Sequence, residues 1–132
     1  MENKKKPVCL VLEPTGVVAF DLSSMVEEAL PCTTLVAVAT EEEALRAMDQ
    51  LLSVDVAFLN TPPTRFESSA LGKALARVNA LVVFLGYETE ARQLGHRSLE
   101  RPFLNRSVAD VLNQYRDCLA ASGLMQGRSP AE

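Results

Sequence analysis

Apolar residues recur along this chain in short continuous runs that alternate with longer stretches of helical spacing. Continuous apolar runs are typical of parallel strands that are buried on both faces. The predicted strands are Val8–Leu12, Thr33–Ala39, Val54–Leu59, Ala80–Leu85 and His96–Glu100. The predicted helices are Gly16–Leu30, Thr40–Leu52, Arg65–Val78, Glu88–Leu94 and Ser107–Ala121, and the proline-containing segment Asn60–Thr64 is predicted to be a loop.

This alternation of strand and helix predicts an α/β domain whose parallel sheet is covered by helices on both faces. Right-handed crossovers leave few ways to order the strands. We expect the flavodoxin-like (βα)5 sandwich with strand order 2-1-3-4-5, whose switch point lies between the first and third strands. Residues 7–121 form the predicted domain, residues 1–6 a flexible tail, and residues 122–132 a disordered tail or a linker stub.

Charge and composition exclude some classes of function. The formal net charge is −4 and 48% of the residues are hydrophobic. An acidic balance argues against binding to nucleic acid, which favours a basic surface. No apolar stretch approaches the ~20 residues of a membrane span, so we expect no membrane partner and a cytoplasmic location. Cys9, Cys32 and Cys118 fit no metal-ligand or disulfide spacing and are expected to be reduced thiols.

The residues that follow the predicted strands are the candidates for function, because ligands bind at the carboxyl ends of the strands in an open parallel sheet. They are Glu13-Pro14, Asn60, Gly86 and Arg101. The predicted strand order places Glu13 beside Asn60. The set offers a carboxylate, an amide and a guanidinium but no nucleophile paired with a base. Since no Ser/His/Asp arrangement, GxGxxG or P-loop is found either, we predict no enzyme activity and no catalytic residue.

Four segments resemble the receiver domain of two-component response regulators, the CheY-like family, and the resemblance covers about Pro7 to Ala121. The segments are Val11-Leu12-Glu13-Pro14, Asp55-Val56-Ala57-Phe58-Leu59-Asn60, Val82-Val83-Phe84-Leu85-Gly86 and Leu99-Glu100-Arg101-Pro102-Phe103. At the corresponding strand ends, receivers carry an acidic pair, the phosphorylated aspartate, a threonine or serine, and Lys-Pro. The resemblance implies a role in bacterial two-component or phosphorelay signalling.

The departures from the receiver pattern change this expectation. Asn60 occupies the phosphoacceptor position, and an amide is not a nucleophile for phosphoryl transfer. Pro14 replaces one of the two acids, so Glu13 alone remains and Mg²⁺ binding is expected to be weak or absent. Gly86 lacks the hydroxyl of that position, and Ser98 stands near the place of the aromatic switch residue.

Two of these positions have alternative interpretations. Asn60 either fixes the domain in one signalling state or is an ordinary loop residue that bonds to backbone. Glu13 and Arg101 either form an ion pair or are solvated separately, and an exposed pair would contribute only ~0–1 kcal/mol. Arg101 keeps the charge of the receiver lysine but not its geometry.

The resemblance therefore leads to the hypothesis of a degenerate receiver, a pseudo-receiver that acts as a regulatory protein-interaction module without phosphorylation. In receivers, the face of the fourth helix, fifth strand and fifth helix binds partners or forms dimers. The corresponding residues here are Arg92, His96, Arg97, Ser107, Asp110 and Tyr115. The expected partner is a signalling protein or a second copy, so a homodimer stays open. The alternative is a sensor of small anions or other small ligands that reuses the receiver pocket.

Overall fold

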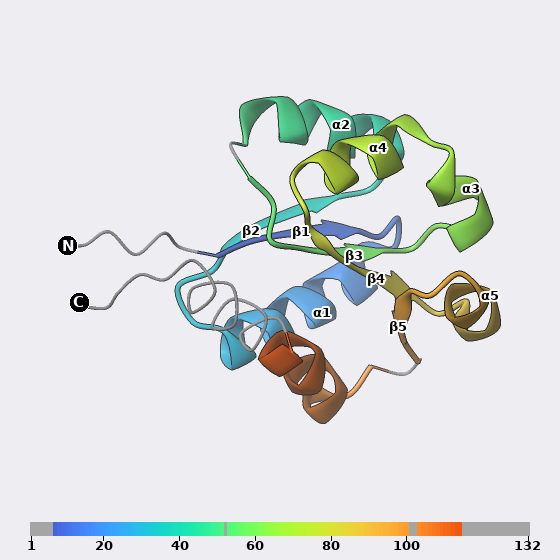
Figure 1. Cartoon of the computed structure of the whole chain (residues 1–132). Coiled ribbons are helices and arrows are strands. Elements are labelled where there is room, and N and C mark those ends of the chain that lie inside the picture. Colours follow the sequence, from blue (N-terminus) through green and yellow to red (C-terminus); the bar gives the residue numbers. More distant parts are fainter. Residues whose placement is uncertain (1–6, 52, 101–102, 115–132) are drawn as a thin grey trace, which may run out of the picture.

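A computed structural model describes residues 7–51, 53–100 and 103–114 of the chain. Its strands form one parallel sheet in the order β2-β1-β3-β4-β5 (Figure 1). They are β1 Val8–Leu12, β2 Thr34–Val38, β3 Val56–Leu59, β4 Leu81–Leu85 and β5 Arg97–Leu99. The predicted flavodoxin-like order is confirmed, with β1 and β3 side by side at the centre of the sheet.

The helices connect successive strands and lie on both faces of this sheet. They are α1 Gly16–Ala29, α2 Glu41–Gln50, α3 Pro63–Glu67, α4 Ala70–Arg77 and α5 Glu88–Gln93, and a further helix covers residues 105–114. None of the helices in the described ranges is long and apolar enough to cross a membrane. The predicted tails 1–6 and 122–132, and the end of the predicted helix Ser107–Ala121, lie outside the described residues.

Two apolar cores lie on opposite faces of the sheet because successive side chains of a strand point to opposite faces. Val11 and Phe58 belong to the core beneath α1 and the helix of residues 105–114, whereas Leu12 and Leu59 belong to the core beneath α2, α3 and α4. Figure 1 shows these two helical layers above and below the sheet. Because both faces are covered, the central strands read as continuous apolar runs in the sequence.

The segment between β3 and β4 differs from its prediction. Pro63 lies in the predicted loop but begins helix α3, since proline is suited to the first position of a helix. The single helix predicted over Arg65–Val78 is two helices. The break lies at Ser69, whose hydroxyl donates to the carbonyl oxygen of Phe66 at 2.7 Å and accepts the amide hydrogen of Gly72 at 3.0 Å. These bonds end α3 and begin α4 within one turn.

The start of α2 is fixed by side chains at its N-terminus. Thr40 is the N-cap residue, and its side chain accepts a hydrogen bond from the backbone nitrogen of Glu43. The Glu43 carboxylate returns a bond to the backbone nitrogen of Ala39, one residue before the cap. Three glutamates in the first turn also complement the helix dipole. Gly95, predicted to follow the end of the α5 segment, has a φ of +79° there.

The two described cysteines are expected to react very differently with an alkylating reagent. Cys9 is fully buried, and burial together with the negative charge of Asp55 raises the pKa of its thiol to about 12. Cys32 is exposed. Since the thiolate is the reactive form, brief treatment with iodoacetamide at pH 8 should label Cys32 and spare Cys9 in the native protein, as read by peptide mass spectrometry. Both should react in denaturant, and equal native labelling would contradict the buried position of Cys9.

Candidate functional site

The carboxyl ends of β1, β3 and β4 bring three of the predicted site residues to one edge of the sheet. Backbone hydrogen bonds extend one residue past each strand and hold these positions. The Glu13 nitrogen donates to the Val38 carbonyl at 3.0 Å, the Asn60 nitrogen to the Leu12 carbonyl at 2.8 Å, and the Gly86 nitrogen to the Leu99 carbonyl at 2.9 Å. The edge is therefore set by the sheet itself rather than by long, free loops.

Glu13 and Asn60 lie side by side, as the strand order predicts. The Asn60 side-chain nitrogen Nδ2 donates to Glu13 Oε1 at 3.0 Å. The backbone nitrogen of Thr15 donates to the other carboxylate oxygen, Oε2, also at 3.0 Å. Glu13 is only 3% exposed, so these bonds compensate for removing a carboxylate from water. The Asn60 amide thus provides a hydrogen-bond donor for one of the two oxygens of the neighbouring carboxylate.

This donor set does not fit the Mg²⁺ ion that the receiver resemblance implies. Mg²⁺ prefers carboxylate and phosphate oxygens in octahedral geometry. Asn60 presents its nitrogen to Glu13, both Glu13 oxygens accept hydrogen bonds, and Pro14 supplies no carboxylate. Within the described residues, no group of three or more His, Cys, Asp or Glu side chains could hold a metal ion. The Glu13 carboxylate thus bonds to the Thr15 backbone and the Asn60 side chain.

Gly86 has a backbone reason to be glycine. Its φ is +86°, and the next residue, Tyr87, is also left-handed with φ +56° and ψ +39°. A β-branched threonine would be strained at the first of these positions, whereas glycine is not. A serine or threonine, which receivers carry there, would therefore be strained in this turn. A hollow of about 390 Å³ lies at this edge of the sheet. It is lined by Asn60, Leu85, Gly86 and Tyr87.

Several predicted site residues lie elsewhere or outside the described residues. Arg101 and Tyr115 are outside them, so the Glu13–Arg101 ion pair stays a prediction. Ser98 lies in β5 opposite Phe84 of β4 and is half-buried. A serine side chain has no aromatic ring, so Ser98 cannot act as the aromatic switch residue of receivers does.

The predicted partner face combines α5, β5 and the helix of residues 105–114. Arg92, Arg97 and Asp110 are exposed on these elements, and Ser107 is half-buried. Arg97 Nε donates to Gln114 Oε1, which connects β5 to the neighbouring helix. This bond joins two of the three elements that carry the predicted partner face.

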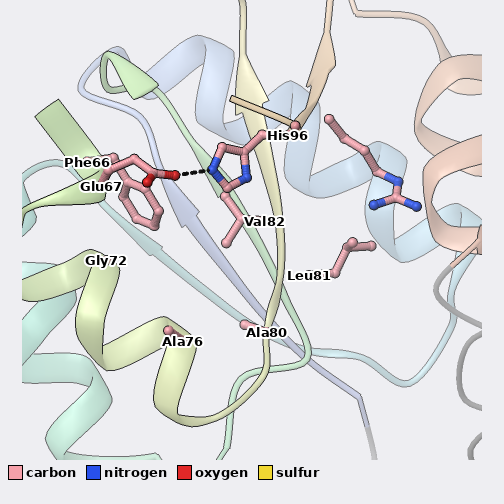
Figure 2. A pocket seen from close by; sticks show the side chains of 10 residues that line it. Phe66, Glu67, Gly72, Ala76, Ala80, Leu81, Val82 and His96 are labelled. Atoms are coloured by element: carbon pink, nitrogen blue, oxygen red, sulfur yellow. Dashed lines mark hydrogen bonds and ion pairs between the residues drawn. The ribbon is translucent and has the colours of Figure 1, made fainter. Parts of the chain in front are cut away.

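His96 has contacts that its polar sequence neighbours do not indicate. Its Nε2 lies 2.6 Å from Glu67 Oε2, and its ring meets those of Phe84 and Phe66 edge to face, with centroid distances of 5.2 and 6.4 Å. It is half-buried on the side of the sheet that carries α4 (Figure 2). Successive residues of an extended chain point to opposite faces. His96, which directly precedes β5, therefore does not lie on the same face as Arg97.

Thr61 is a second residue whose role sequence reasoning missed. It is buried, and its hydroxyl donates to Glu41 Oε2 at 3.1 Å. This bond ties the loop after Asn60 to the first turn of α2. A hydroxyl next to a strand end gives no sequence signal for such a contact, because Glu41 lies 20 residues away in the chain.

Comparison with known proteins places this architecture among receiver domains. No protein-family model matches the sequence, and no curated protein matches it. Among solved structures, a two component transcriptional regulator AraC from Clostridium phytofermentans ISDg is similar, with a TM-score of 0.71 and 14% identity over 91% of this chain and 99% of that one.

Two further solved structures are similar. A CheY-like response regulator receiver domain from Methylobacillus flagellatus has a TM-score of 0.62 and 18% identity over 84% of this chain and 99% of its own. A CheY-like protein (tadZ) from Pseudomonas aeruginosa PAO1 has a TM-score of 0.58 and 18% identity over 97% of this chain and 99% of its own. At these identities the likeness concerns the fold, and the chain has the fold of a response regulator receiver domain.

Proposed function

We propose that this chain is a degenerate receiver domain, a regulatory protein-interaction module of two-component-type signalling that works without aspartyl phosphorylation. The observation that carries the proposal is the hydrogen bond from Asn60 Nδ2 to Glu13 Oε1 at 3.0 Å. It stands where a phosphorylated receiver would hold an aspartate and a metal ion. An amide cannot accept a phosphoryl group there, and the remaining carboxylate is engaged by the chain itself.

The interaction surface proposed for a protein partner is the face of α5, β5 and the helix of residues 105–114. Its support is the shared exposure of Arg92, Arg97 and Asp110 on adjoining elements. A mixed-charge face of this kind favours a polar, reversible contact with another signalling protein over a permanent one. Without a phosphorylation switch, occupancy of this face would follow the concentration of the partner. No catalytic role is assigned to any residue.

A magnesium and beryllofluoride titration tests the proposal directly, because beryllofluoride with Mg²⁺ mimics a phosphoryl group on aspartate. We expect no change in the amide NMR signals of Glu13, Asn60 and Gly86 at any beryllofluoride concentration that saturates an ordinary receiver run in parallel. Saturable changes at these three signals, spreading to Ser98 and α5, would overturn the proposal.

A second candidate function is supported by the hollow of about 390 Å³ next to Asn60 and Gly86. This volume is within the range of sites for small ligands, about 300–1,000 Å³. If the chain is a sensor of small anions, inorganic phosphate alone, without Mg²⁺, should shift the Gly86 and Tyr87 signals saturably. Arg101→Ala should then abolish the effect. Absence of any phosphate-dependent change would leave the interaction module as the better account.

A further inference from the structure

Helix α1 carries two large apolar side chains that the domain does not bury. Val17 is 72% exposed and Phe20 is 71% exposed. They are three positions apart, so they project from the same side of the helix and form one ridge. The opposite side of α1 supplies Ala19, Leu22 and Val26 to the core. This pair, called the α1 ridge below, is an exposed apolar feature that core packing does not explain.

The α1 ridge stands in an acidic part of the molecule. Every charged residue from Glu13 to Glu43 is negative, and this stretch holds α1, β2 and the start of α2. The acidic residues are Glu13, Asp21, Glu27, Glu28, Glu41, Glu42 and Glu43. An apolar contact surrounded by one sign of charge selects a partner surface of the opposite sign, because like charges disfavour association.

A hollow with a mixed polar and apolar lining lies on the other face of the sheet. Phe66, Ala76, Ala80, Val82 and His96 line a space of about 380 Å³ between α4 and the strands β4 and β5, here called the α4 hollow (Figure 2). Ala80, which precedes β4, and Val82 near the start of β4 are half-buried, whereas Val83 to Leu85 are buried.

Arg97 and Glu67 line the α4 hollow, and the other charged residues of the adjoining helices α3 and α4 are basic. Both charged residues of α4, Lys73 and Arg77, are basic and exposed, and Arg65 of α3 is exposed as well. Glu67 is the acid that lines the hollow, and it is bonded to His96. The molecule therefore has an apolar projection among negative charges on one face and a partly apolar hollow next to several basic residues on the other.

We propose that the α1 ridge of one copy inserts into the α4 hollow of a second copy, so that the chain assembles head to tail. The occupant is inferred from the opposite signs of charge around the ridge and beside the hollow. Ridge and hollow lie on opposite faces of the sheet, so two copies cannot satisfy both contacts at once. Each added copy leaves one free ridge and one free hollow, and such a heterologous contact builds a ring or an open filament. This interface does not depend on the proposed function of the receiver pocket.

Sedimentation velocity on the full chain over a range of concentrations tests the proposal at low ionic strength. We expect the average mass to rise above that of one chain as concentration increases and to fall again when salt screens the opposite charges. Phe20→Glu should keep the chain monomeric, and so should Ala76→Glu, because each removes one side of the contact. Both positions are exposed, so folding is retained. Ala70→Glu adds the same charge to α4 at an exposed position outside the hollow and should still assemble.

Mixing the two monomeric variants makes the decisive measurement. The Phe20→Glu chain keeps an intact hollow and the Ala76→Glu chain keeps an intact ridge, so an equimolar mixture should form a heterodimer that stops at two copies. A mixture that stays monomeric would overturn the head-to-tail contact. Wild-type protein that stays monomeric at every concentration, or assembly that survives Phe20→Glu, would overturn it as well.

Discussion

Replacing Asn60 by aspartate is expected to lower the free energy of unfolding by about 2 kcal/mol at pH 7. In the wild-type protein, Asn60 Nδ2 donates to Glu13 Oε1 at 3.0 Å, and Glu13 is buried. An ionised aspartate cannot donate this bond and brings a second negative charge to within contact of the first. Urea unfolding followed by circular dichroism measures the difference. An unchanged free energy would mean that a cation at this edge neutralises the added charge, with Arg101 the first residue to test.

The loss in Asn60→Asp should depend on pH in a defined direction. Repulsion between the two carboxylates raises the pKa of one of them in the folded state above its unfolded value of about 4. A group with a raised folded pKa binds more protons in the folded state, so the variant loses stability as pH rises. The difference from wild type should be small near pH 4 and complete by about pH 7.

Asn60→Ala is the matched control for this substitution. It removes the hydrogen bond to Glu13 without adding a charge, so its loss should be smaller, about 1 kcal/mol at pH 7, and should change less with pH than the loss in the aspartate variant. Equal losses for the alanine and aspartate variants at pH 7 would contradict the like-charge explanation. The comparison separates the effect of losing the Asn60 hydrogen bond from the effect of adding a negative charge.

Magnesium gives an independent readout of the same pair. Asn60→Asp would set two carboxylates side by side, which is a donor set that Mg²⁺ accepts. Millimolar MgCl₂ should therefore raise the free energy of unfolding of the variant, since an ion that binds only the folded state stabilises it. Wild-type protein should show no such gain at equal ionic strength. This contrast would tie the loss of the metal site to the single change from carboxylate to amide.

The strands and their order could be predicted because they depend on short apolar runs and on general rules of connection. Val8–Leu12 is the clearest case, since its predicted and observed bounds agree. The contact between Glu13 and Asn60 could be predicted for the same reason. Once β1 and β3 are neighbours and parallel, the residues that follow them must lie at one edge.

Features that depend on contacts across the fold could not be predicted in this way. Pro62-Pro63 can end a loop or begin a helix. Here Pro63 begins α3, and the Ser69 side chain bonds to the Phe66 carbonyl at the other end of that helix. His96 stands in a polar segment, and only the packed structure brings Phe84 and Glu67 to its ring. The positive φ of Gly86 is likewise a property of the folded turn, although it explains why that position lacks a hydroxyl.

Gly72→Ala is expected to lower the free energy of unfolding by about 3 kcal/mol. A Cβ atom at this position would lie 2.3 Å from the carbonyl oxygen of Phe66, far inside the contact distance. The carbonyl cannot simply move away, because it accepts the Ser69 hydroxyl that also caps α4. Phe66 is buried against Phe84, with ring centroids 5.3 Å apart, which fixes α3 from the other side. Thermal and urea unfolding both measure the loss.

Gly16→Ala is the matched control, because the same methyl group is added to a helix at a position where a Cβ would meet nothing within 4 Å. Alanine restricts the unfolded chain more than glycine does, so this variant should be more stable than wild type by about 0.5–1 kcal/mol. Opposite signs for the two substitutions would show that the cost at Gly72 comes from the Phe66 carbonyl. A loss of similar size at both positions would instead contradict the close approach of α3 and α4. Because the pair shares its chemistry and differs only in surroundings, the sign alone decides.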